Sequence, residues 1–303
     1  MKLVFFGTGA FALPALRALA PHVALVVAQP DRPAGRGMRM QAAPTKVLAQ
    51  ELGLTVETPE KSRSPEFVDR LRELDADAFV VASYGQILSQ KVLDSARRGG
   101  INLHGSILPK YRGAAPIQRC LLSGESETGV TLMQMDKGMD TGDIVHIERL
   151  AIGPEETYGE IQDRLAELAA SMAADWMPRI VAGDYPRTPQ DDGQATLAPK
   201  VEKAEAELST GRKAKEEFDR YRAFTPAPGA FLRTSVGVLR ISKATPGRCS
   251  GEPGTICGID AGFSLAFSEG SLELLEVQPE GKKRMSGRDY VNGARLRIGS
   301  RFI

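Results

Sequence analysis

Five short segments in the first part of the chain, most of their residues apolar, have the length of β-strands. They cover residues 1–6, 23–28, 78–83, 100–103 and 130–135. Continuous apolar runs bounded by turns are typical of strands buried on both faces. Other segments place apolar residues at helical spacing, over residues 11–19, 44–52, 65–74 and 157–180. Strands that alternate with helices predict an α/β fold built on a doubly wound, Rossmann-like parallel sheet.

The pattern changes after residue 185. Prolines, an Asp-Asp-Gly turn and a charged run over 186–207 predict a linker that crosses the surface of the first domain. A helix is predicted over 212–223. Short apolar segments separated by Gly and Pro then follow, which is typical of a small β-barrel. We therefore expect an α/β domain over 1–185, the linker, and an OB-like barrel over 208–303.

Composition narrows the class of protein. Hydrophobic residues make up 42% of the chain and charged residues 25%, as in soluble globular proteins. The apolar runs are far shorter than the roughly 20 residues that span a bilayer. The first run is broken by Gly7-Thr8-Gly9, which does not fit a signal peptide. We expect a cytoplasmic protein and, because no heptad or obvious apolar patch calls for a partner, a monomer.

The three cysteines are too few and too scattered to predict a disulfide framework or a zinc knuckle. We expect them to be buried thiols in a reducing compartment, namely Cys120, Cys249 and Cys257.

Charge is unevenly distributed. Residues 1–205 contain 23 Lys and Arg against 27 Asp and Glu, whereas residues 206–303 contain 16 against 11. A basic last third indicates a polyanionic partner such as RNA.

A glycine-rich turn follows the first strand. Gly7-Thr8-Gly9 leads into a helical segment, and Asp31 lies 24 residues after Gly7, which fits a loose dinucleotide-binding fingerprint. The same turn serves any corner between a strand and a helix. A nicotinamide-dependent oxidoreductase therefore remains an alternative, but Arg32 in a Pro/Gly/Arg-rich loop is an unusual wall for an adenosine ribose.

Candidate chemistry begins where the strand over 100–103 ends. Asn102 and His104 are two residues apart, so on a strand their side chains point to the same side. Sites of doubly wound folds lie at the carboxyl ends of strands. An amide can stabilise the oxyanion of an acyl-transfer intermediate, and an imidazole can exchange a proton near neutral pH. The pair favours acyl transfer.

An acidic loop with two glycines follows the strand over 130–135. Its aspartates are Asp136, Asp140 and Asp143. Their spacing does not match an EF-hand and no glutamate closes the loop, so we expect no metal there.

The sequence resembles a known family at these motifs. NLHGSILPKYRGAAPIQ from Asn102, followed by GVTLMQMDKGMDTGDIV, is similar to the catalytic domain of 10-formyltetrahydrofolate-dependent formyltransferases. FFGTGAFALPALRAL, QPDRPAGRG, ASYGQIL and the C-terminal GKKRMSGRDYVNG extend the similarity to the methionyl-tRNA formyltransferases over nearly the whole chain.

The resemblance implies roles for the site. Asn102 would bind the formyl oxygen, His104 would stabilise the tetrahedral intermediate and handle its proton, and Asp140 would orient or charge-tune His104. The acceptor would be the α-amine of methionyl initiator tRNA and the donor 10-formyltetrahydrofolate, with no metal. The folate would be held by two segments, namely Ser106, Ile107, Leu108 and Pro109, and Tyr84, Gly85, Ile87 and Leu88 with the acidic loop.

The resemblance also implies contacts to tRNA. The loop over 29–40 carries three arginines with Gly and Pro hinges, and in the family this loop enters the acceptor stem. Arg36 and Arg39 in this loop, and Lys200 in the linker, are the expected tRNA contacts. The chain departs from the family at Ala227 and Leu197, where aromatic residues are common, which affects details of tRNA docking.

Other acceptors stay open at this point. A formyltransferase that acts on a sugar amine or on glycinamide ribonucleotide would share the Asn, His and Asp chemistry. The arginine loop and the basic barrel favour tRNA over these small amines.

Overall fold

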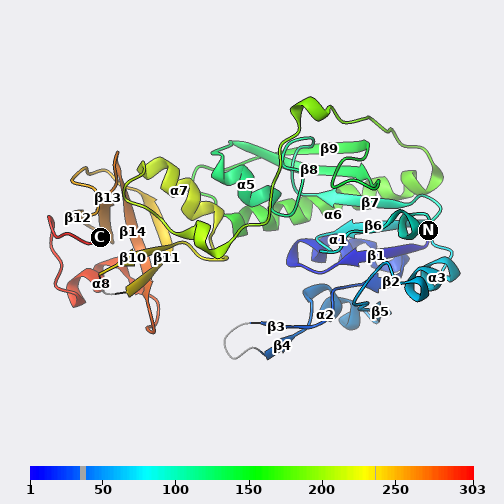
Figure 1. The fold of residues 1–303 in the computed structure, drawn as a ribbon, viewed down its shortest axis with the longest axis horizontal. Helices are drawn as coiled ribbons and strands as arrows, with labels where there is room; N and C mark the ends of the chain where they lie inside the picture. Colours follow the sequence, from blue (N-terminus) through cyan, green and yellow to red (C-terminus); the bar gives the residue numbers. More distant parts are fainter. Residues whose placement is uncertain (35–38, 236) are drawn as a thin grey trace. The chain divides into compact units, whose positions relative to one another are not determined.

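The computed structural model describes residues 1–34, 39–235 and 237–303 (Figure 1). The chain divides into two compact units. The first contains residues 1–116, 127–151 and 162–199, and the second contains residues 117–126, 152–161 and 200–303.

The first unit is built on a seven-stranded sheet with the order β5-β2-β1-β6-β7-β8-β9 (Figure 1). Neighbours from β5 to β7 are parallel, whereas β8 is antiparallel to both β7 and β9. The expected α/β fold is confirmed, and the antiparallel pair at one end is an addition to it. The strands are β1 (Leu3–Gly7), β2 (Val23–Val27), β5 (Val56–Glu57), β6 (Ala78–Ala82), β7 (Gly100–His104), β8 (Glu127–Gln134) and β9 (Ile144–Ala151).

The apolar runs form strands because both sheet faces are covered. Every residue of β1 and β6 is buried, and the Phe6 ring lies 5.2 Å from the rings of both Phe79 and Tyr84. Burial on both faces accounts for the absence of polar alternation in these segments. The helices of the chain up to residue 182 are α1 (Leu13–Leu19), α2 (Pro44–Glu51), α3 (Pro65–Glu73), α4 (Gln90–Leu93), α5 (Pro116–Leu122) and α6 (Tyr158–Ala182).

Residues 185–199 run along the first unit as an extended connector. Thr188 and Ile144 exchange two backbone hydrogen bonds of 2.8 and 2.9 Å, so the connector pairs briefly beside β9. Further along, Leu197 pairs with Arg112. Residues 185–199 therefore lie against this unit.

The second unit contains an antiparallel sheet with the order β10-β11-β14-β13-β12, and β15 pairs with β14 (Figure 1). The predicted small β domain is confirmed. Its apolar core includes Phe263, whose ring lies 5.4 Å from that of Phe302. The elements are α7 (Ala214–Ala223), β10 (Phe231–Thr234), β11 (Gly237–Pro246), β12 (Ile256–Ile259), β13 (Phe263–Ala266), β14 (Ser271–Pro279), β15 (Met285–Ser286) and α8 (Gly287–Gly293). A separate two-stranded sheet pairs β3 (Arg32–Ala34) with β4 (Arg39–Gln41).

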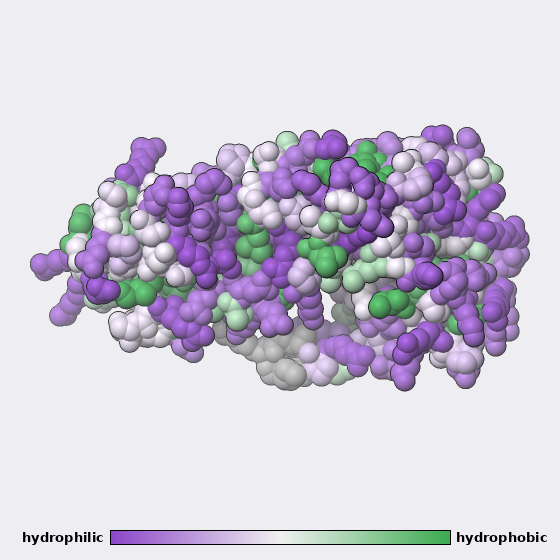
Figure 2. All heavy atoms as spheres, turned by 45° about the horizontal axis from the view of Figure 1, so that its top comes forward, coloured by the Kyte–Doolittle hydropathy of each residue, from purple (hydrophilic) through white to green (hydrophobic). Residues whose placement is uncertain are grey.

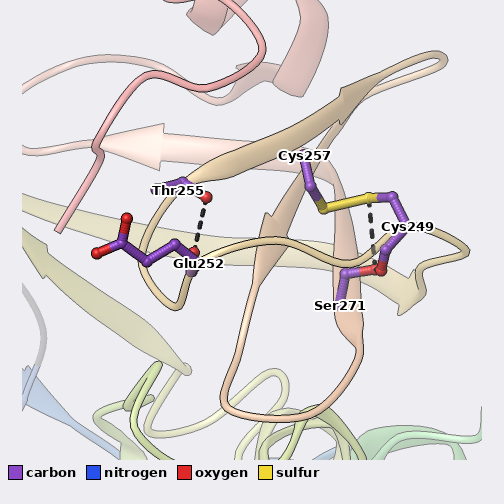
Figure 3. The surroundings of a disulfide bond; sticks show 5 residues. All are labelled: Cys249, Glu252, Thr255, Cys257 and Ser271. Atoms are coloured by element: carbon purple, nitrogen blue, oxygen red, sulfur yellow. Dashed lines mark hydrogen bonds between the residues drawn. A yellow bond between two sulfur atoms is a disulfide. The ribbon is translucent and has the colours of Figure 1, made fainter.

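The expectation of three reduced cysteines is wrong for two of them. Cys249 and Cys257 form a disulfide, with Cα atoms 5.9 Å apart (Figure 3). The intervening chain turns back on itself, where the Thr255 hydroxyl donates to the Glu252 carbonyl at 2.7 Å. The Ser271 hydroxyl of β14 donates to the Cys249 carbonyl at 2.6 Å and holds the segment beside the sheet. Cys120 is a buried free thiol, as expected.

Among the described residues, no helix has the length and apolar character needed to cross a membrane. The face drawn in Figure 2 is mostly hydrophilic, and hydrophobic residues are scattered over it in small groups.

Candidate active site

The structure brings Asn102, His104 and Asp140 together. Asn102 and His104 lie on β7, in register with Met133 and Thr131 of β8. The Asn102 Nδ2 donates to Asp140 Oδ1 at 3.1 Å, and His104 Nδ1 lies 3.7 Å from Asp140 Oδ2. The side chains of Asn102 and His104 thus converge on the Asp140 carboxylate, although Asp140 is 38 residues from Asn102.

The Asp140 carboxylate is held in place from a second side. The Gly113 amide donates to Asp140 Oδ2 at 2.9 Å. Asp140 has a φ of 55°, in the left-handed region that non-glycine residues rarely adopt. The loop before it is tied by Asp136, whose carboxylate accepts from the Gly138 amide and the Thr141 hydroxyl at 2.9 and 2.8 Å. The loop therefore presents Asp140 in a defined direction.

The position of the His104 proton follows from its partners. His104 is 5% exposed, and its Nε2 lies 3.0 Å from the carbonyl of Tyr111. A carbonyl only accepts, so Nε2 must carry the donated hydrogen. In the neutral ring Nδ1, which faces Asp140, is then the unprotonated nitrogen. Nδ1 is therefore the ring nitrogen whose lone pair can accept a hydrogen.

The segment after β7 is fixed by one buried hydroxyl. Thr131 Oγ1 donates to the Ser106 carbonyl at 2.6 Å and accepts from the Leu108 amide at 3.1 Å. Ser106 and Leu108 are buried, whereas Ile107 and Pro109 are half-buried. The surface that this segment can offer to a ligand is its backbone with Ile107 and Pro109.

The segment after β6, residues 84–88, also contains both buried and exposed residues. Tyr84 and Leu88 pack into the core, each 2% exposed, and burial raises the pKa of the Tyr84 phenol to about 12. Ile87 is 84% exposed, and Gly85 is exposed with a φ of 88°. Gly85 and Ile87 can contact a ligand, whereas Tyr84 and Leu88 support them from within.

The expected tRNA contacts are less fully described. Arg36 lies outside the described residues, and Arg39 begins β4. Lys200 is exposed in the second unit, where its carbonyl accepts from Arg119 at 3.3 Å.

Close packing explains the glycine at the end of β1. A Cβ on Gly7 would lie 2.7 Å from the Phe5 ring and 3.2 Å from the Ala82 carbonyl. The Thr8 hydroxyl donates to the Tyr84 carbonyl at 2.8 Å, so this turn is joined to the end of β6. The glycine that suggested a dinucleotide is therefore accounted for without a phosphate.

Sequence reasoning did not identify four residues that surround the centre. Arg112 and Gly113 lie inside a motif that was recognised as a whole, and their individual contacts have no local signal. Gln190 and Thr196 come from the connector, where polar residues are expected to face solvent. Thr196 Oγ1 instead accepts from the Tyr111 amide at 2.8 Å, and Gln190 contacts the Asp140 loop.

Comparisons with known proteins agree with these motifs over the whole chain. Residues 1–177 match the formyl transferase family, and residues 200–295 match the formyl transferase C-terminal domain. The chain is 44% identical to the methionyl-tRNA formyltransferase of Symbiobacterium thermophilum, over 100% of this chain and 95% of that protein. It is also 44% identical to that of Chromobacterium violaceum, over 100% and 99%.

Solved structures share the fold at lower identity. An N-formyltransferase from Helicobacter canadensis, in complex with folinic acid and dTDP-3-aminofucose, aligns with a TM-score of 0.67 at 17% identity, covering 90% of this chain and 98% of that one. HypX from Aquifex aeolicus with tetrahydrofolic acid aligns with a TM-score of 0.66 at 15% identity, covering 96% and 47%. The full-length matches at much higher identity decide the relationship. The chain belongs to the formyl transferase family and, within it, to the methionyl-tRNA formyltransferases.

Proposed function

We propose that this protein transfers the formyl group of 10-formyltetrahydrofolate to the α-amine of methionyl initiator tRNA, producing formylmethionyl-tRNA. The observation that carries the chemistry is the Asp140 carboxylate, which accepts from Asn102 at 3.1 Å and faces His104 Nδ1 at 3.7 Å. An amide donor, an imidazole and a carboxylate in this arrangement suit acyl transfer through a tetrahedral intermediate.

Asn102 stabilises the charge that develops on the formyl oxygen. Its amide nitrogen carries two N–H groups, and one of them is engaged by Asp140. The other is available to donate to the formyl oxygen when the amine nitrogen bonds to the formyl carbon. Because the bond to Asp140 fixes the direction of the amide, little reorganisation is needed as the negative charge forms.

His104 carries the proton between the two amines. A new bond forms from the α-amine nitrogen to the formyl carbon, and the bond from that carbon to the folate nitrogen breaks. The attacking amine loses a proton and the leaving folate nitrogen gains one. His104 Nδ1 serves this transfer, since Nε2 is occupied by the Tyr111 carbonyl. Asp140 stabilises the imidazolium that forms.

The donor fits the two segments beside this centre. Exposed Ile87 and half-buried Ile107 offer apolar surface for an aromatic ring system, and Gly85 leaves backbone groups open to hydrogen bonding. We assign the folate contacts to Gly85 and Ile87 and to the backbone of residues 106–109 with the side chains of Ile107 and Pro109. The expected contacts Tyr84, Leu88, Ser106 and Leu108 have buried side chains, so their part is to support these segments and to offer backbone groups.

Arg36, Arg39 and Lys200 are the proposed tRNA contacts. We also propose that residues 1–185 form the catalytic domain and that residues 208–303, with their excess of Lys and Arg, bind tRNA beyond the linker 186–207. Because the proposed substrates are those of translation initiation, we propose that the protein acts in the cytoplasm, as a monomer.

The test supplies the protein with 10-formyltetrahydrofolate and methionyl initiator tRNA, and separately with an amino-sugar nucleotide. We expect formylmethionyl-tRNA as the product. Transfer to the sugar amine without formylation of the tRNA would overturn the assignment of the acceptor and favour a formyltransferase that acts on sugar amines. No transfer to either amine would overturn the assignment of the chemistry.

A further inference from the structure

Gln190 is the one residue in the run 186–194 that is not exposed. Its side chain turns away from solvent, although proline, arginine and aspartate neighbours on either side face outward. An inward-facing amide in a solvated connector needs partners, because a buried polar group without hydrogen bonds costs free energy.

The Gln190 amide makes hydrogen bonds with both of its polar atoms. Nε2 donates to the carbonyl of Asp140 at 2.9 Å and to that of Gly142 at 2.7 Å. Oε1 accepts from Arg112 Nε at 3.0 Å and from Arg112 Nη2 at 2.8 Å. The amide therefore uses both donors and both acceptor sites, and it joins the Asp140 loop to the loop after β7.

Arg112 is the anchor of this arrangement. It is 7% exposed, and its guanidinium also pairs with Asp192 at 2.8 Å. The connector binds its backbone as well, since the Arg112 amide donates to the Thr196 carbonyl at 2.8 Å and its carbonyl accepts from the Ala198 amide at 2.7 Å. A buried charge with this many partners has little freedom to move.

Gly113, which follows Arg112, binds the Asp140 carboxylate directly. The Gly113 amide donates to Asp140 Oδ2, and a Cβ at this position would lie 2.7 Å from the Ala198 carbonyl. Glycine is required there, both by this contact and by a φ of 129°. The connector thus supports Asp140 in two ways. Gln190 binds the Asp140 backbone, and Ala198 packs against Gly113, which binds the Asp140 carboxylate.

The left-handed backbone of Asp140 needs such support. A non-glycine residue at a φ of 55° persists only where surrounding contacts determine it. The orientation of the carboxylate sets its distance to His104 Nδ1, which is 3.7 Å. Small displacements of a catalytic group reduce rates strongly.

We propose that Gln190, anchored on Arg112, is a positioning residue that holds Asp140 against His104. This role rests on the proposed formyl transfer, in which Asp140 stabilises the His104 imidazolium. Gln190 contacts neither reacting group, so its effect on the rate is exerted through the Asp140 backbone.

The test compares two matched substitutions in the connector. Gln190→Met keeps the length of the side chain and removes all four hydrogen bonds. Gln194→Met is the control, because Gln194 is exposed and its amide donates only to Asp191, at 2.8 Å. We expect Gln190→Met to lower kcat roughly 10- to 100-fold with KM for both substrates nearly unchanged. The control keeps the wild-type kcat.

A spectroscopic signature separates positioning from loss of structure. The chain has three histidines, so the imidazole signals in an NMR spectrum resolve individually. Gln190→Met is expected to shift the signals of His104 and to leave those of His22 in place, whereas Gln194→Met shifts neither. If Gln190→Met does not fold, Gln190→Glu serves instead, since it keeps an acceptor for Arg112 but sets a carboxylate oxygen against two carbonyls.

Three results would overturn the role of Gln190. They are an unchanged kcat, a loss confined to KM, or a loss of kcat with the His104 signals unmoved. If the wild-type protein forms no formylmethionyl-tRNA, the proposed function fails, and the His104 signals of the two variants still decide whether Gln190 sets the geometry of the centre.

Discussion

Asn102 Nδ2 donates to Oδ1 of Asp140 at 3.1 Å, so an amide on β7 is fixed by a carboxylate on the loop after β8. The other oxygen of that carboxylate accepts from Gly113 and faces His104. In the proposed reaction, this one carboxylate would both orient the Asn102 amide toward the oxyanion and stabilise the charge on the His104 imidazolium. Both functions depend on the charge of Asp140 and on its left-handed backbone.

Removing that charge is expected to slow the reaction. Asp140→Asn keeps the size of the side chain but leaves the His104 imidazolium without a counter-charge, so kcat should fall roughly 10²- to 10⁴-fold. Asp143→Asn is the matched control from the same loop. The Asp143 carboxylate pairs with Arg187, 3.0 Å from its Nε, and not with His104. Steady-state kinetics with both substrates measures the effect. Equal kcat values for the two variants would contradict the role of Asp140.

Arg36 tests the assignment of the acceptor. Arg36→Ala is expected to raise KM for methionyl-tRNA by about tenfold, the effect of losing one good charged contact of 1–2 kcal/mol, while folate binding stays unchanged. Arg72→Ala on α3 is a control, since Arg72 pairs with Asp69 at 3.0 Å. Steady-state kinetics at two salt concentrations measures KM for methionyl-tRNA, and calorimetry measures the affinity for folate. An unaltered KM for tRNA would remove Arg36 from the interface.

An ion pair in the second unit predicts a dependence of stability on pH. The hydrogen bond from Arg119 holds the pKa of the Glu205 carboxyl below its ordinary value of 4.5. Because the folded pKa is the lower one, the stabilisation is complete at neutral pH and is lost as the pH falls below 4.5 through the folded value. Glu205→Gln should lower the free energy of unfolding by about 1 kcal/mol at neutral pH.

Urea unfolding at neutral and at acid pH measures this contribution. The difference between wild type and Glu205→Gln is expected to shrink in acid, where the wild-type carboxyl is protonated. Glu155→Gln, at an exposed position, should show no comparable difference. A difference that grows as the pH falls would contradict the sign of the shift.

The disulfide predicts a sensitivity to reductant. Cys249 and Cys257 are separated by 8 residues, and closing a loop of this size is expected to stabilise the folded state by about 2.5 kcal/mol. Dithiothreitol should therefore lower the urea midpoint of the wild-type protein. The double variant Cys249→Ser with Cys257→Ser should start at the lower midpoint and not respond to reductant. A wild-type midpoint that does not change on reduction would exclude the stabilising role.

Much of the fold could be predicted because its signals are local. The runs that became β1 and β6 are apolar throughout, since both faces of the sheet are covered. The alternation of side chains along β7 also put Asn102 and His104 on one side, and both reach Asp140. By contrast, β9 was not predicted, because as an edge strand it is only partly buried and carries His146, Glu148 and Arg149 among its apolar residues.

The remaining features depend on contacts between distant residues. Gln190 is one polar residue in a solvated run. It lies 50 residues from Asp140 in the sequence, and only folding brings the two together. Cys249 and Cys257 are brought together by a turn of the folded chain, and the Ser271 hydroxyl of β14 binds the Cys249 carbonyl; cysteine spacing does not encode this arrangement. Asp140 itself came from the family resemblance, because an acidic loop alone does not indicate which aspartate faces the histidine.

The most direct measurement is a single-turnover assay with 10-formyltetrahydrofolate and methionyl initiator tRNA, both saturating, for the wild-type protein and for His104→Ala. We expect the wild type to form formylmethionyl-tRNA and His104→Ala to form it roughly 10²- to 10⁴-fold more slowly, because the variant lacks the group proposed to carry the proton. Equal single-turnover rates for the two proteins, or no formylmethionyl-tRNA from the wild type, would contradict this expectation.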